Sequence, residues 1–78
     1  MNRAEIESGV GEILSTVLER GNAANLARSN EAAWDSLKHM QIVFAIEEKF
    51  GVRFSEEQIP RLDSFPKIVD CVYSLNAS

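Results

Sequence analysis

The residues of this chain that could carry chemistry gather near its middle. Ser36 stands between Asp35 and Leu37, and the only histidine, His39, follows three positions after the serine. A catalytic serine needs a general base and an oxyanion site, yet Ser36 lies in no GxSxG turn and has no histidine near it except His39. We therefore predict that the protein is not an enzyme and has no catalytic residue, and we place His39 beside the serine on a helix surface.

Cys71 is the only cysteine, which excludes a disulfide bond within the chain. Together with His39 it provides two of the four ligands that a structural zinc site needs, so we expect no metal site. The simplest role for Cys71 is that of a small core residue, because free cysteines are usually buried.

Ser36 lies where a loop gives way to a largely apolar run, at the expected N-terminus of a helix. Unpaired amides and the helix dipole would stabilise an exposed phosphate ester on this serine by about 0.3–1 kcal/mol. The simpler interpretation is that Asp35 or Ser36 is a plain N-cap. Neither Lys38 nor His39 is the Glu or Gln that would complete a capping box, so the junction is not optimised for capping alone.

Apolar spacing predicts four helices and no strand. The first and second helices are expected at 3–19 and at 36 or 37–50. The first should stop at Gly21, which can adopt a left-handed conformation, and a loop over 22–35 follows with Leu26 and Trp34 as apolar anchors. The buried stripe of the first helix is predicted to be Ile6, Val10, Ile13, Leu14, Val17 and Leu18.

The third predicted helix has a compact start signal. Ser55 and Gln58 can form a capping box, with Phe54 against Ile59 as a hydrophobic staple. Pro60 lacks an amide hydrogen and clashes with the preceding turn, so this helix must be short.

The last helix should begin after a cap at Asp63 or Ser64, with Pro66 in the tolerated first turn. Its buried stripe is predicted to be Phe65, Ile68, Val69, Val72 and Tyr73. The fold predicted from these signals is an all-α four-helix bundle with a long first loop and a short third helix.

The second helix is apolar on more than one side. At about 100° per residue, one arc faces the core and a second stripe lies beside it. The first arc comprises Ile42, Val43, Ile46 and Phe50. The second stripe comprises Leu37, Met40 and Phe44. Either the helix is wholly covered, or the second stripe stays exposed, bordered by Glu47 and Glu48, as a docking surface for a partner with a basic rim.

Size and charge limit the functions open to the chain. Its 78 residues suffice for one small domain over residues 1–78, without a deep catalytic cavity. A net charge of −4 argues against nucleic-acid binding. The sequence has neither a secretion signal nor an apolar run of the roughly 20 residues that span a bilayer, so we expect a cytoplasmic protein without membrane insertion.

The run from Asp35-Ser36-Leu37 to Glu47-Glu48-Lys49-Phe50 resembles the acyl carrier protein family, whose second helix begins with Asp-Ser-Leu and ends with Glu-Glu-x-Phe. The resemblance continues through GVRFSEEQI and LDSFPKIVDCV, and so covers nearly the whole chain. It implies a four-helix carrier domain with no catalysis of its own, acting as a monomer.

By this resemblance, Ser36 is esterified with 4'-phosphopantetheine, taken from coenzyme A by a separate magnesium-dependent phosphopantetheinyl transferase. The arm's thiol then holds acyl groups as thioesters for acyl-loading and acyl-processing enzymes with basic docking patches. Asp35 matches the acid that helps the transferase recognise its substrate. The residues that match the family's docking face are Leu37, Met40, Phe44, Glu47 and Glu48.

Three departures widen the choice of pathway. Many members have a small residue, often glycine, two positions before the aspartate and an acid just after the leucine, where this chain has Ala33-Trp34 and Lys38. Lys49 replaces a frequent third acid. The cargo pathway is therefore fatty-acid, polyketide or another specialised acyl synthesis. The alternatives are an aminoacyl or peptidyl carrier and an unmodified helical docking module.

Overall fold

A computed structural model describes residues 2–21 and 26–77 of the chain. These residues form three α-helices, α1 (Arg3–Leu18), α2 (Ser36–Phe50) and α3 (Phe65–Ala77), with a short 3-10 helix, η1 (Ile59–Arg61), before α3. They contain no strand, only an isolated bridge between Ala27 and Ser64. The all-α prediction is confirmed. Asn22, the predicted start of the first loop, lies outside the described residues.

Helix α1 begins with a complete capping box that the sequence reading did not use. The Asn2 side chain accepts a hydrogen bond from the Glu5 amide at 2.8 Å, and the Glu5 carboxylate accepts one from the Asn2 amide. At the other end, Glu19 rather than Gly21 adopts the left-handed conformation, with φ 56°. The predicted stop residue is therefore wrong, because the chain already turns at Glu19 and carries Arg20 to an ion pair with Glu31.

Helix α2 ends as predicted, with Gly51 in the left-handed conformation at φ 64°. Its predicted core arc is confirmed, because Ile42, Val43 and Ile46 are fully buried and Phe50 nearly so. Phe50 packs against Gly9 of α1, where a Cβ atom would lie only 2.6 Å from the Phe50 ring. Gly9 is thus a packing requirement, although by propensity alone it weakens its helix.

The predicted third helix is not an α-helix. The expected box forms, since the Ser55 amide donates to Gln58 Oε1 at 2.8 Å and the Gln58 amide donates to Ser55 Oγ at 3.2 Å. This capping box closes a turn, and only the three-residue 3-10 helix η1 follows it. Pro60 lies inside η1, where its missing amide prevents an α-helix from continuing. The described residues therefore form three α-helices and a 3-10 turn.

Helix α3 has the predicted cap, since Ser64 Oγ accepts a hydrogen bond from the Lys67 amide. Ile68, Val69 and Val72 are buried as predicted. Tyr73 is not: it is 43% exposed and its ring lies under the Arg3 guanidinium, 5.8 Å away.

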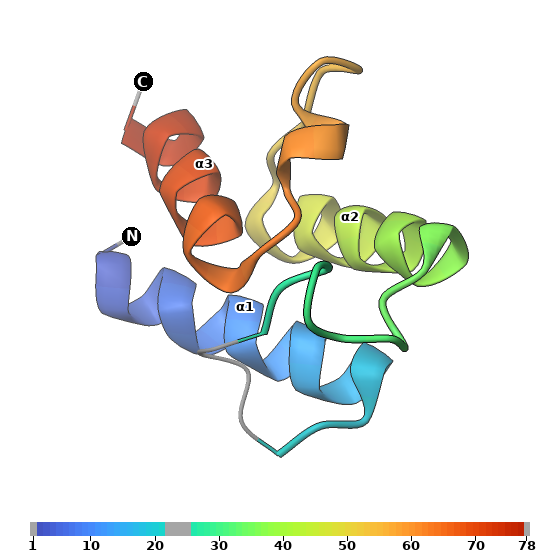
Figure 1. Ribbon diagram of the computed structural model, residues 1–78. Helices are drawn as coiled ribbons and strands as arrows, with labels where there is room; N and C mark the ends of the chain where they lie inside the picture. Colours follow the sequence, from blue (N-terminus) through green and yellow to red (C-terminus); the bar gives the residue numbers. More distant parts are fainter. Residues whose placement is uncertain (1, 22–25, 78) are drawn as a thin grey trace.

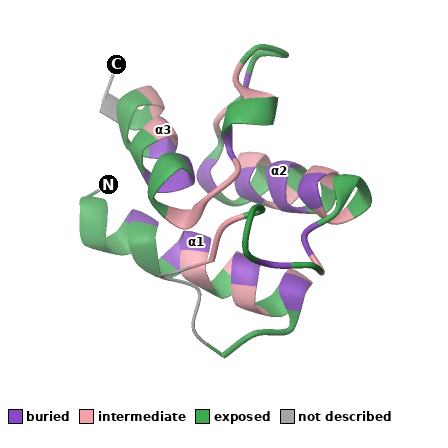
Figure 2. Ribbon diagram, in the orientation of Figure 1, coloured by how far each residue is buried: buried purple, intermediate pink, exposed green. Residues whose placement is uncertain are grey.

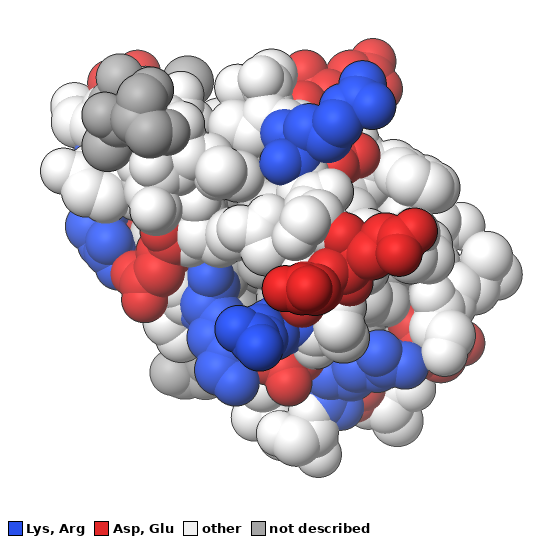
Figure 3. Space-filling view, turned by 90° about the horizontal axis from the view of Figure 1, so that it is seen from above, with Lys and Arg blue, Asp and Glu red and all other residues white. Residues whose placement is uncertain are grey.

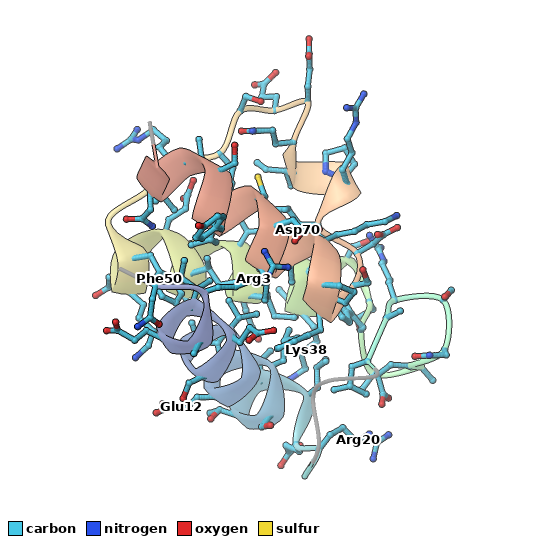
Figure 4. The ribbon with its side chains drawn as sticks, turned by 90° about the vertical axis from the view of Figure 1, so that its left-hand side faces the viewer. Arg3, Glu12, Arg20, Lys38, Phe50 and Asp70 are labelled. Atoms are coloured by element: carbon cyan, nitrogen blue, oxygen red, sulfur yellow. The ribbon has the colours of Figure 1, made fainter. Side chains whose placement is uncertain are left out.

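The start of α1 contacts the middle of α3. Arg3 also pairs with Asp70, and Figure 4 shows these two side chains next to each other. The first turn of α1 and the last turn of α3 lie on the same side of the molecule in Figure 1. Cys71, predicted to be a core residue, is only half-buried, and this burial raises the pKa of its thiol.

The core lies between the three α-helices, whose buried residues face inward (Figure 2). Its buried apolar residues are Ile6, Val10, Leu14, Leu18, Trp34, Ile42, Val43, Ile46, Phe50, Phe54, Leu62, Ile68, Val69 and Val72. Ile13, Val17 and Phe65, which were also expected in the stripes, are half-buried against it. In the described part of the chain, none of the helices is long and apolar enough to cross a membrane.

Candidate modification and docking site

The start of α2 is capped by Asp35 and not by Ser36. Asp35 has extended backbone geometry, and its carboxylate accepts a hydrogen bond from the Lys38 amide at 2.9 Å. Its carbonyl oxygen accepts a hydrogen bond from the His39 amide at 2.8 Å, and this bond closes the first turn of the helix. Ser36 is the first helical residue and its hydroxyl takes no part in the cap.

The Ser36 hydroxyl is exposed and has one polar partner. The Arg28 guanidinium donates a hydrogen bond from Nη2 to Ser36 Oγ, with 3.0 Å between the two atoms. Arginine has no acceptor, so the serine oxygen accepts and its own proton stays free to point elsewhere. The sequence analysis missed Arg28, because its contact with Ser36 depends on the path of the loop between them.

That loop is fastened to the start of α3. The Arg28 amide donates to the Asp63 carbonyl at 2.7 Å, and the Phe65 amide donates to the Leu26 carbonyl at 3.0 Å. The bridge between Ala27 and Ser64 lies between these two bonds. The backbone that carries the arginine is therefore tied to a helix 35 or more positions away in the sequence.

His39 does not lie on the surface beside Ser36, so that prediction is wrong. It is 4% exposed, and its Nδ1 accepts a hydrogen bond from Trp34 Nε1 at 2.9 Å. Since Nδ1 must accept, the ring proton is on Nε2, which donates to the Ile59 carbonyl at 2.7 Å. His39 thus joins α2 to η1. Its place on the same helical arc as Ile42 and Ile46 was a signal that the sequence reading could have used.

A second polar contact fixes the loop before α2. Glu31 is 7% exposed and accepts hydrogen bonds from Arg20 Nε at 2.6 Å and Nη2 at 2.9 Å. The Ala33 amide donates to the same carboxylate at 3.1 Å. The hydrogen bonds from Arg20 and then from Ala33 lower the pKa of Glu31 to about 2. The sequence analysis did not predict the ion pair between Arg20 and Glu31.

The second apolar stripe of α2 is largely uncovered. Leu37 is 68% exposed and Phe44 59% exposed, while Met40 is half-buried. Of the two interpretations of this helix, the wholly covered one is therefore wrong. Two large apolar side chains on one exposed side are available to a partner.

The two acids expected to border this stripe have different surroundings. Glu47 is half-buried, and its Oε2 accepts a hydrogen bond from the Phe54 amide at 2.8 Å, so it holds the segment after α2. Glu48 is exposed, and both line a hollow with Phe44 and Arg53. On the face shown in Figure 3, acidic and basic side chains are interspersed and form no continuous patch of one sign.

Among residues 2–21 and 26–77, no three His, Cys, Asp or Glu side chains are grouped so that they could hold a metal ion. No model of a known protein family matches the chain, and a search of curated proteins gives no match either. The site combines an exposed serine hydroxyl at the first residue of a helix, bonded to Arg28 and not to the helix amides, with an exposed apolar stripe beside it.

Proposed function

We propose that this protein is a stand-alone acyl carrier protein that holds acyl intermediates as thioesters on a 4'-phosphopantetheine arm attached to Ser36. The observation that carries the proposal is the division of roles at the start of α2. Asp35 alone caps the helix, and the Ser36 hydroxyl is exposed at the first helical position. A serine needed only as a cap would direct this oxygen to the first-turn amides, whereas Ser36 Oγ accepts its hydrogen bond from Arg28.

The resemblance to the carrier family supports the same proposal. The Asp35-Ser36-Leu37 motif lies at the start of the long α2, and Glu47-Glu48-Lys49-Phe50 at its end. In the four-helix arrangement of the family, η1 would take the place of the short third helix. This architecture is part of the proposal.

The chain's own residues would bind and present, without performing the chemistry. The arm supplies a thiol that carries the acyl group. The first-turn amides of α2 provide favourable surroundings for the phosphate that joins the arm to Ser36. Asp35 holds the helix start in the geometry that a transferase must recognise. The exposed Leu37 and Phe44, with Met40, form the apolar part of the docking face.

Partners of such a carrier are the phosphopantetheinyl transferase and the acyl-loading and acyl-processing enzymes. Their docking patches would be basic, to complement Glu48 and the net charge of −4. We further propose that the protein acts as a cytoplasmic monomer and binds no nucleic acid. The cargo pathway is fatty-acid, polyketide or another specialised acyl synthesis, and an aminoacyl or peptidyl cargo would use the same attachment site.

The test is the intact mass after incubation with coenzyme A, Mg²⁺ and a broad-specificity phosphopantetheinyl transferase. The parent protein should gain one phosphopantetheine, and the Ser36→Ala variant should gain none while remaining folded. Ser74→Ala, which removes another exposed hydroxyl, is the matched control and should gain the group as the parent does.

The exposed stripe of α2 favours a second candidate, a helical docking module that carries no arm. A module of this kind would bind its partner equally well with alanine at position 36. A folded parent protein that gains no mass with any of several transferases, and whose partner binding is unchanged by Ser36→Ala, would replace the carrier proposal with this one.

A further inference from the structure

We propose that Arg28 is a positioning residue for the modification of Ser36, and that its guanidinium pairs with the phosphodiester once the arm is attached. This inference rests on the proposed carrier function. Arg28 does not belong to the Asp-Ser-Leu motif, and it reaches the serine from the loop before α2.

The direction of the hydrogen bond suits the reaction. Arg28 Nη2 donates to Ser36 Oγ at 3.0 Å, so the arginine approaches the oxygen that becomes the ester oxygen. It leaves the serine proton free for a base of the transferase. A fixed cation at this oxygen interacts more strongly as negative charge develops on it and on the phosphoryl group.

The charge of Arg28 is not neutralised by a neighbouring carboxylate. The ion pairs among the described residues join Arg3 to Asp70, Arg20 to Glu31 and Lys67 to Asp63, and Arg28 belongs to none of them. Arg3 and Arg20 are thus committed to protein carboxylates. Arg28 keeps its remaining donors for an anion, and the planar guanidinium matches the oxygens of a phosphodiester.

The backbone around Arg28 is held independently of its side chain. The Arg28 amide donates a hydrogen bond to the Asp63 carbonyl, and the Phe65 amide donates one to the Leu26 carbonyl. Both hydrogen bonds join main-chain atoms alone. The Ala27 amide donates to Asn30 Oδ1 at 3.0 Å and closes the turn that follows. A substitution of the exposed Arg28 side chain therefore removes the guanidinium and leaves these bonds in place.

In the transfer, Ser36 Oγ forms a bond to the phosphorus that carries pantetheine in coenzyme A. The bond from that phosphorus to the adenosine 3',5'-bisphosphate part breaks, and this part leaves with the bond's electron pair. A base of the transferase takes the serine proton. Arg28 gains and loses no proton, and its contribution is electrostatic throughout.

The first measurement compares kcat and KM for transferase-catalysed conversion of the parent, Arg28→Gln and Arg28→Lys, with coenzyme A as donor. We expect Arg28→Gln to lower kcat about tenfold, the effect of losing one charge-assisted hydrogen bond. Arg28→Lys should recover part of this loss, because lysine keeps the positive charge but lacks the planar set of N–H donors of the guanidinium. Lys49→Gln is the matched control: it removes one exposed positive charge at the other end of α2, and it should leave kcat within about twofold of the parent value.

The second measurement is NMR of the isolated protein before and after conversion. The side-chain N–H resonances of Arg28 should shift when the arm is attached, and the ³¹P resonance of converted Arg28→Gln should differ from that of the converted parent. The proposal would be overturned if Arg28→Gln had the same kcat as the parent. It would also be overturned if the substitution changed KM alone and the Arg28 resonances of the parent did not shift on conversion. The latter result would place Arg28 in the transferase interface. Failure of the parent itself to gain the group is a separate outcome, which would overturn the carrier function and this inference with it.

Discussion

The two ends of α2 are held by different forces. At the C-terminal end, Phe50 packs directly against Gly9, and Gly51 closes the helix. At the N-terminal end, directed hydrogen bonds act beside the packing of the buried Trp34: its Nε1 donates to His39 Nδ1, and Arg28 donates to Ser36 Oγ.

This difference bears on where the proposed attachment site can lie in so small a domain. Apolar packing covers the atoms that it uses, as at Phe50, and the side chains left exposed in the last turn are the charged Glu48 and Lys49. Hydrogen bonds fix the N-terminal end through a few directed contacts and leave the Ser36 oxygen exposed. Ser36 can therefore be changed without removing any core contact.

The largest effect is expected at the packed end. Phe50→Ala should lower the free energy of unfolding by about 3–5 kcal/mol, because it removes a buried ring and leaves a cavity beside Gly9. Urea melts followed by circular dichroism measure this loss. A loss below about 1 kcal/mol would mean that packing does not hold this end of the helix.

A smaller loss is expected at the polar end. Trp34→Phe removes the indole donor and leaves His39 Nδ1 buried without a partner, at a cost of about 1–3 kcal/mol. A double-mutant cycle with His39→Leu, followed by urea melts, should give a coupling energy of at least about 0.5 kcal/mol. Strictly additive losses would contradict the hydrogen bond between these two side chains.

The stability contributed at the N-terminal end of α2 should also be the part that is lost in acid. The pKa of Glu31 in the folded protein is about 2, below its ordinary value of 4.5. Its contribution to stability is therefore complete above pH 4.5 and is lost as the pH falls from there to about 2. Fluorescence of Trp34, the only tryptophan, reports unfolding in urea at each pH. Glu31→Gln should be less stable than the parent at neutral pH, and the difference should shrink across this range. A constant difference would show that the ion pair with Arg20 does not hold the loop.

The smallest effect on stability is expected on the exposed side of α2. Phe44→Ala makes the same chemical change as Phe50→Ala in the same helix, yet Phe44 is 59% exposed, so the loss should stay below about 0.5 kcal/mol. Leu37→Ala should behave alike. Under the proposed carrier function, both should weaken docking, seen as a higher KM of the phosphopantetheinyl transferase for the variant proteins. A destabilisation comparable to that of Phe50→Ala would show that this side is covered.

Local signals in the sequence were enough for the helices. The all-α class, the start of α2 at Asp35 and Ser36, its end at Gly51 and its buried arc follow from apolar spacing and caps, which act over three or four residues. Such signals failed where two of them competed. The box at Ser55 and Gln58 formed, but Pro60 decided what followed it.

The amino-acid sequence by itself thus determined the three α-helices, the apolar arcs of α2 and the Asp35-Ser36 junction at which this helix begins. Only the tertiary structure decided the surroundings of that serine. It placed Arg28 on Ser36 Oγ, turned His39 from the surface into the core, and left Leu37 and Phe44 uncovered. The physical reason is that helix periodicity and caps are short-range. These contacts depend instead on a loop whose backbone is bonded to the start of α3, far away in the sequence.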